Sequence, residues 1–64
     1  MAIHLKAARV NAGYTQEEAA KKLGIGKRTL VNYEKYKTKP SIEVAKKMAE
    51  LYHTTVDEII FFAK

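Results

Sequence analysis

The apolar residues of this chain recur with helical spacing, and no stretch alternates apolar and polar residues as a half-buried strand does. Leu5, Ala8 and Ala12 follow the spacing i, i+3, i+7, which predicts a first helix over about residues 3–12. Gly13 comes next and can take the left-handed conformation that ends many helices. We therefore expect the chain to begin with one short helix.

Two further helices are predicted to follow in close succession. Thr15 and Glu18 have the spacing of a capping box, which starts a helix over about residues 16–23. A three-residue turn then leads to a third helix over residues 27–35, with Gly26 as its N-cap. Two helices joined this tightly cross steeply. They need a small residue at the crossing, a left-handed residue in the turn, and apolar residues that pack between the helices. The residues at the required positions are Ala20, Gly24, Ile25, Leu30 and Tyr33. The sequence thus predicts a helix-turn-helix unit over residues 16–35.

The second half of the chain is also predicted to be helical. Pro40 disfavours helical backbone at the preceding residue, so residues 37–40 are expected to form a loop. Ser41 can cap a fourth helix. Its apolar face would consist of Val44, Ala45, Met48, Leu51 and Tyr52. Together with the segment described next, this pattern predicts one compact all-α domain of five short helices over residues 1–64.

The C-terminal segment is predicted to form the fifth helix. Thr55 and Glu58 repeat the capping-box spacing, and the apolar residues 59–62 follow. Ile59 is expected in the core. The remaining apolar side chains would be exposed in a monomer and are candidates for a homodimer contact: Ile60, Phe61 and Phe62. Burial under the first helix, a different protein partner or a membrane contact are the alternatives.

The charge distribution points to a polyanionic partner. The chain has 64 residues and a net charge of +5. Seven basic residues lie between Lys21 and Lys39 against one acid, Glu34, whereas acids predominate from residue 41 to residue 63. One end of the molecule should therefore be electropositive, as in nucleic-acid-binding proteins. A solvated lysine-rich surface would show the same excess, so charge alone does not decide between them.

Other classes of protein are not supported by the residues present. The chain has no cysteine, which excludes disulfides and thiolate metal sites. His4 and His53 are far apart in sequence, without a clustered pair of carboxylates. We therefore expect no enzymatic activity, no metal and no cofactor. There is no signal-peptide pattern, and the longest apolar run, residues 59–63, is far below the roughly 18–20 residues of a membrane span. A cytoplasmic protein is expected.

The third predicted helix has two chemically different faces. Leu30 and Tyr33 lie on one side of it, facing the expected core. The opposite arc carries Lys27, Arg28, Val31, Asn32 and Lys35. Arginine and lysine can bond the guanine O6/N7 edge, and asparagine can bond the adenine N6/N7 edge. Ordinary solvated helix charge is the alternative interpretation.

The segment TQEEAAKKLGIGKRTLVNYEKYKTKPS, residues 15–41, resembles the phage lambda repressor and Cro family of helix-turn-helix regulators. The resemblance extends from Leu5-Lys6-x-x-Arg9 to Val56-Asp57-Glu58-Ile59. It implies five helices, binding to double-stranded DNA as a homodimer or as paired copies on an inverted repeat, and control of transcription. The expected function is that of a repressor of phage or mobile-element type, in a bacterial or phage-encoded, nucleoid-associated protein. An antitoxin-like regulator that mainly holds a protein partner, or a pure protein-interaction module, are the rival hypotheses.

The resemblance also implies roles for individual residues. Bases would be contacted by Lys27, Arg28 and Asn32. The candidates for contacts with the DNA backbone are Gln16, Thr29, Tyr33, Lys35, Lys37, Thr38 and Lys39. Gln16 matches a glutamine that also bonds the third helix. Tyr33 matches a residue that packs the joint, so a purely core role is the alternative for it.

Arg9 and Glu34 match an arginine and a glutamate that pair in related repressors, so Glu34 is interpreted as structural. A contact from a cytosine amino group to Glu34 is the alternative. Two positions depart from the family pattern. Tyr36 replaces a glycine, and because tyrosine resists the left-handed conformation, the third helix is expected to run further or to end differently. Gly26 replaces a serine or threonine cap, which removes a side-chain phosphate contact and costs only a few tenths of a kcal/mol.

Overall fold

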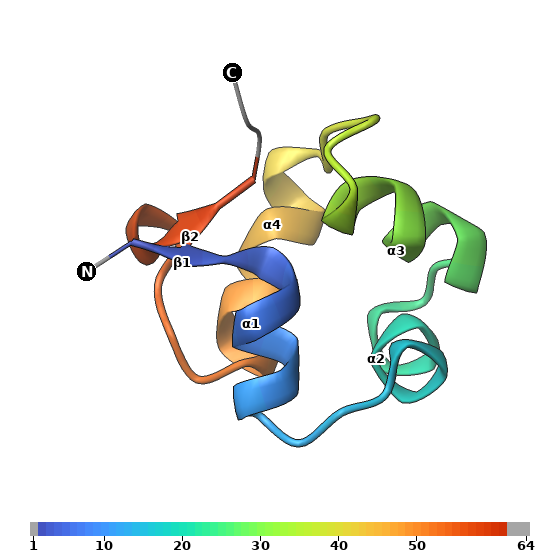
Figure 1. The fold of residues 1–64 in the computed structure, drawn as a ribbon, viewed down its shortest axis with the longest axis horizontal. Coiled ribbons are helices and arrows are strands. Elements are labelled where there is room, and N and C mark those ends of the chain that lie inside the picture. The colour runs from blue at the N-terminus through green and yellow to red at the C-terminus, as the bar shows by residue number, and fades with distance from the viewer. Residues whose placement is uncertain (1, 62–64) are drawn as a thin grey trace.

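Four α-helices and two very short strands form the part of the chain that the structure, a computed structural model, describes, residues 2–61 (Figure 1). In chain order the elements are β1 (Ile3–His4), α1 (Leu5–Asn11), α2 (Gln16–Leu23), α3 (Lys27–Glu34), α4 (Ile42–Leu51), the 3-10 turn η1 (Val56–Glu58) and β2 (Ile59–Ile60). The predicted second, third and fourth helices are therefore present. The first begins two residues later than predicted, because Ile3 and His4 are extended.

The local signals at the start of α2 act as predicted. The Glu18 amide donates to the Thr15 hydroxyl at 3.1 Å, and the Thr15 amide donates to the Glu18 carboxylate at 2.9 Å. These bonds satisfy two backbone groups that the first turn of a helix otherwise leaves unpaired. The pKa of the Glu18 carboxyl is lowered, chiefly because the Thr15 backbone amide and also the Thr15 side chain hydrogen-bond to its charged form. The start of α2 is therefore determined by four consecutive residues.

The predicted fifth helix is wrong. Residues 56–58 form a single 3-10 turn, and Ile59–Ile60 then runs parallel to β1, with Ile3 opposite Ile59. The second capping box is also absent, because the Thr55 hydroxyl donates to the Glu58 carboxylate at 3.3 Å instead of accepting from the backbone. Two β-branched isoleucines pack well on an extended backbone, and β1 supplies the hydrogen-bond partners. That partner lies more than fifty residues away, so local spacing cannot reveal it.

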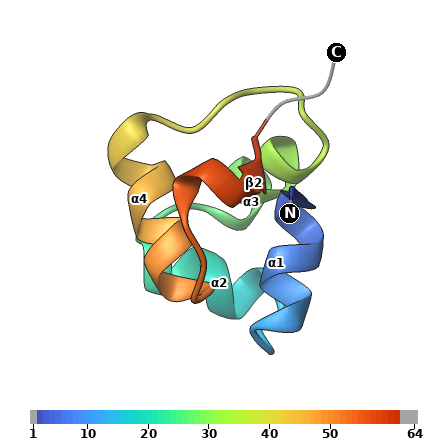
Figure 2. The same ribbon diagram turned by 90° about the vertical axis from the view of Figure 1, so that its left-hand side faces the viewer.

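The core lies where the four helices meet, beneath the small parallel sheet (Figure 1 and Figure 2). Leu5, Leu30 and Met48 have no exposed surface. The small residues Ala19 and Ala20 are also buried, which lets α2 approach α3 closely. Ile25 and Tyr33 are half-buried against this cluster, and Ile59 enters it as predicted. The joint of the helix-turn-helix is thus part of the main core.

Tyr36 does not alter the way α3 ends, although its side chain predicts that it would. Tyr36 adopts the left-handed conformation, with φ of 62°, in the position of the usual glycine. The Tyr36 amide donates to the Tyr33 carbonyl and the Lys37 amide to the Asn32 carbonyl, at 3.1 and 2.9 Å. This pair of bonds is the Schellman motif. The helix therefore ends at Glu34 with the geometry that glycine would give, and the expectation for Tyr36 was wrong.

The N-terminal strand contacts Tyr36, whose left-handed backbone conformation is unfavourable for a residue with a side chain. The His4 ring nitrogen Nδ1 hydrogen-bonds to the Tyr36 hydroxyl, and the two rings lie 5.7 Å apart between centroids. A left-handed non-glycine residue costs roughly 1–2 kcal/mol, which a hydrogen bond of about 1 kcal/mol and a ring contact can largely offset. Tertiary contacts thus overcome the local preference of tyrosine.

Candidate nucleic-acid interface

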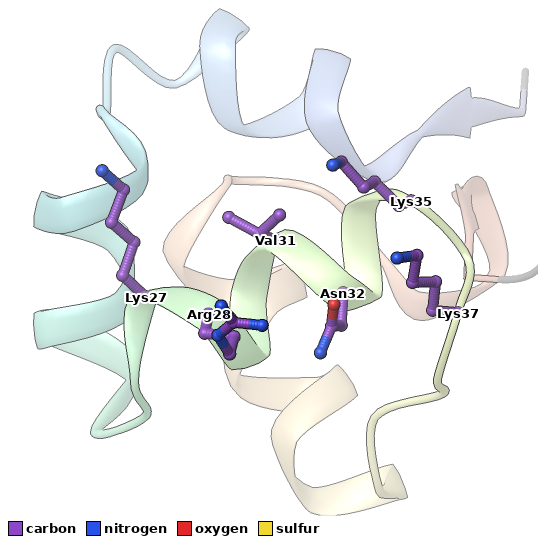
Figure 3. A pocket seen from close by; sticks show the side chains of 6 residues that line it. All are labelled: Lys27, Arg28, Val31, Asn32, Lys35 and Lys37. Carbon is purple, nitrogen blue, oxygen red and sulfur yellow. The ribbon is translucent and has the colours of Figure 1, made fainter.

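The outward side of α3 forms a shallow hollow together with the loop that follows it. The hollow is lined by Lys27, Arg28, Val31, Asn32, Lys35 and Lys37 (Figure 3). Leu30 fixes the orientation of the helix, because it is the side chain of α3 that is fully buried on the opposite side. Figure 3 shows the six side chains on one side of the molecule, with Arg28, Val31 and Asn32 between Lys27 at one end and Lys37 at the other. The face is therefore presented by a helix that the core holds in place.

The chemistry of this face suits a polyanion that also offers hydrogen-bond acceptors. Four of the six side chains are cationic, and the fifth polar side chain, Asn32, can both donate and accept. Val31 adds an apolar surface between them, which can touch a thymine methyl group. Such a mixture of charge, amide and apolar surface on one exposed helix allows both phosphate and base-edge contacts.

Most of the predicted site residues lie together, although not all of them do. Lys27, Arg28, Asn32, Lys35 and Lys37 share the hollow. Thr38 and Lys39 are exposed in the loop beside it, whereas Thr29 and Tyr33 are half-buried and Tyr33 packs against the core cluster. Ile60 and Phe61 are half-buried, and Phe62 lies outside the described residues.

A buried ion pair joins α1 to the end of α3. The Arg9 guanidinium donates to both carboxylate oxygens of Glu34, from Nε at 2.7 Å and from Nη2 at 3.2 Å. The side chains are 8% and 3% exposed. Arg9 also donates to the Tyr14 carbonyl, and the Gln16 amide donates to Glu34 at 3.0 Å. Both oxygens of Glu34 are thus engaged inside the protein and its side chain is 3% exposed, which favours the expected structural role over a contact with a cytosine.

Three features of this region were not predicted from the sequence. Helical spacing predicts Val31 on the outward arc without a contact to DNA, whereas the structure shows that it lines the hollow between Lys27 and Lys35 (Figure 3). Glu17 forms an ion pair with Lys27, at 3.5 Å between Oε1 and Nζ. His4 contacts Tyr36, at the start of the loop that carries Lys37. The position of Val31 between Lys27 and Lys35, at intervals of four residues, was the one local signal available.

Tyr52 lies near the Arg9–Glu34 pair and provides a stability prediction. Tyr52 is 5% exposed, and its hydroxyl makes no hydrogen bond to the described residues. Burial, with a smaller effect from the Glu34 charge, raises the pKa of its phenol from 10.0 to about 12. Replacing Tyr52 by phenylalanine should therefore raise the free energy of unfolding by about 1 kcal/mol at pH 7, because a buried hydroxyl without a partner is removed.

The pH dependence of this variant tests the same argument. Between pH 10 and 12 the unfolded chain loses the Tyr52 proton while the folded protein keeps it, so wild-type stability falls as the pH rises through this window. Tyr52→Phe lacks this contribution, so its advantage should grow above pH 10. Urea unfolding of wild type and Tyr52→Phe, at pH 7 and again between pH 10 and 12, measures the difference in their free energies of unfolding. A variant less stable than wild type at pH 7 would show that the hydroxyl has a partner.

Two other kinds of site receive no support from the described residues. Within residues 2–61, no group of histidine, aspartate and glutamate is placed to hold a metal ion. None of the helices in this part of the chain is long and apolar enough to cross a membrane.

Comparison with known proteins places this geometry in context. A family model described as helix-turn-helix matches residues 5–59. The transcriptional regulator ImmR of Bacillus subtilis is 45% identical over 56 residues, which are 88% of this chain and 44% of that protein. An uncharacterized HTH-type transcriptional regulator of Archaeoglobus fulgidus is 36% identical, with 97% of this chain and 89% of the relative covered. The cryptic phage CTXphi transcriptional repressor RstR of Vibrio cholerae is 36% identical, with coverages of 81% and 47%. The chain therefore spans less than half the length of ImmR and RstR.

Proposed function

The chain belongs to the helix-turn-helix family of lambda-repressor and Cro type, whose members are transcriptional regulators and not enzymes. From this premise we propose that it represses transcription by binding a specific sequence of double-stranded DNA. The observation that carries the proposal is the single outward face on which Lys27, Arg28 and Asn32 lie together on α3. A relative named as a phage repressor agrees with the repressing direction.

In the proposed complex, α3 enters the major groove and α2 crosses the DNA backbone. Arg28 and Lys27 contact guanine edges, Asn32 contacts an adenine edge, and Val31 contacts a thymine methyl group. The loop residues Lys37, Thr38 and Lys39, together with Lys35, contact phosphates and fix the register of the helix. Base contacts then select the sequence, while phosphate contacts supply most of the affinity.

Two copies are proposed to bind one operator. A single α3 reads only a few base pairs, so a two-fold pair on an inverted repeat, with half-sites roughly 34 Å apart, would double the readout. Ile60 and Phe61, which are half-buried on β2 and just beyond it, are the proposed contact between the copies. Footprinting of an enriched duplex should then show two protected half-sites about one helical turn apart.

Replacing Arg28 by alanine tests the base-contacting role. The protein is first used to enrich a duplex from a random pool, and each variant is then titrated with that duplex and with single-base changes of it. Arg28→Ala should cost about 1–3 kcal/mol of binding free energy and relax the preference at one base position. Both effects are expected because the variant lacks the bidentate contact that Arg28 is proposed to make with one guanine.

Lys37→Ala is the matched control, because it removes one charge from the same face. It should weaken binding to every sequence alike and lower the steepness of the salt dependence by about one. If Arg28→Ala instead behaved like Lys37→Ala, with uniform loss and unchanged base preference, α3 would not be reading bases. If wild type enriched no duplex at all, the proposed function would be wrong.

A further inference from the structure

One contact of the outward face has no part in the proposed function: Lys27, which lines the hollow, forms an ion pair with Glu17. We propose that Glu17 is a specificity-determining residue: its carboxylate holds Lys27 and keeps it from serving as an unselective phosphate contact. Lys27 then engages DNA where a base edge offers acceptors in place of the carboxylate. The inference rests on the proposed function, since it concerns how the same face chooses among DNA sequences.

The geometry places an acid beside one of the proposed base-contacting residues. Glu17 is the second residue of α2 and Lys27 is the first residue of α3, and the steep crossing of these helices brings the two starts together. The Oε1 to Nζ distance is 3.5 Å, with 78% and 54% of the side chains exposed. In Figure 3, Lys27 extends from α3 toward α2, away from Arg28.

The ion pair is weak enough for Lys27 to leave Glu17 when DNA offers a better partner. An exposed ion pair is worth at most about 1 kcal/mol, so it can be broken at little cost when a better partner is present. Moving Lys27 to any partner on DNA leaves the Glu17 carboxylate unpaired beside a polyanion. A phosphate offsets this loss only weakly, because it replaces one anion by another. A guanine edge offers two directed acceptors and a discrimination of about 1–3 kcal/mol. The exchange is therefore favourable at the right base and nearly neutral elsewhere.

An acidic group such as the Glu17 carboxylate improves discrimination by weakening the complexes with DNA of other sequences. Glu17→Gln keeps the size and the helix position but removes the charge. Its affinity for a duplex of random sequence should rise by about two- to fivefold, the range that an exposed ion pair allows. The salt dependence of that binding should steepen by about one, because Lys27 now neutralises a phosphate. The affinity for the enriched duplex should rise less, so the ratio of specific to random binding falls.

Asp57→Asn is the matched control for net charge. Asp57 is exposed on η1, which lies with β2 on the side of the molecule away from α3 (Figure 1 and Figure 2). This variant makes the same change in net charge, yet it should leave the steepness of the salt dependence and the specificity ratio unchanged. Thermal unfolding of both variants, followed by circular dichroism, checks that each is folded.

A double-mutant cycle separates the pair from a general charge effect. In a Lys27→Met background, Glu17→Gln should raise random-duplex affinity less than it does in wild type, because no lysine is released and only the direct repulsion of the carboxylate is removed. An equal gain in that background would overturn the proposal, as would an unchanged affinity and salt dependence in the single variant. If wild type enriches a duplex while Glu17→Gln behaves identically, this inference alone fails. If wild type enriches none, the proposed function fails.

Discussion

Replacing Glu34 by alanine should destabilise the protein by about 3–5 kcal/mol, because it leaves the buried Arg9 guanidinium without its partner. A domain of 64 residues has on the order of 3–10 kcal/mol of total stability. The variant should therefore be largely unfolded at ordinary temperature. Three donors are affected, since two nitrogens of Arg9 and the Gln16 amide all lose the carboxylate. Urea unfolding followed by circular dichroism measures the loss.

Two comparisons determine whether the loss comes from the buried pair. Glu17→Ala breaks the exposed pair with Lys27 and should cost no more than about 1 kcal/mol. The double variant Arg9→Met, Glu34→Leu removes both charges, so it should be more stable than the sum of the single changes predicts. Additive losses, or a Glu34→Ala variant as stable as Glu17→Ala, would contradict the structural role of the pair.

Replacing Leu30 by alanine should cost about 2–5 kcal/mol, because Leu30 has no exposed surface and is the buried anchor of α3. The truncation leaves a cavity between α3 and the alanines of α2, and the surrounding helices can fill it only in part. DNA binding should weaken in proportion to the fraction of unfolded protein. It should recover at low temperature or in a stabilising osmolyte, because the outward face is unaltered.

Val31→Ala is the matched control one residue along the same helix. Val31 is half-buried and lines the outward hollow, so its truncation should lower stability by less than about 1 kcal/mol. Its effect should appear in the discrimination at one thymine position instead. If Leu30→Ala kept full stability, or if Val31→Ala destabilised the protein equally, the division of α3 into a core side and an outward side would be wrong.

The features that could be predicted from the sequence are those decided within a few residues. Thr15 and Glu18 determine where α2 begins, because their side chains bond each other's backbone amides. Gly24 determines where it ends, since its left-handed conformation is open to glycine without cost. The two sides of α3 follow from helical spacing alone, which puts Leu30 opposite Arg28 and Asn32. The helix-turn-helix and its outward face are therefore local properties of the chain.

The pairing of Arg9 with Glu34 was predicted in a different way. The two residues are 25 positions apart, so spacing could not join them. The resemblance to related repressors supplied the pair, and the structure adds the second bond from Arg9 and the bond from Gln16. The burial of the pair, which makes its loss so costly, is visible only when α1 is packed against the end of α3.

The remaining features depend on contacts between distant segments. Ile59–Ile60 forms a strand because Ile3–His4 lies beside it, and the same apolar run would suit a helix without that partner. Tyr36 takes a conformation that its own side chain disfavours, because the end of α3 and His4 hold it there. The partner of Lys27 is Glu17, which the crossing of α2 and α3 brings to it. Propensity and capping act over a few residues, so the sequence by itself determined the helices and the composition of the outward face. Only the tertiary structure decided the C-terminal strand, the end of α3 and the neighbours of the proposed base-contacting residues.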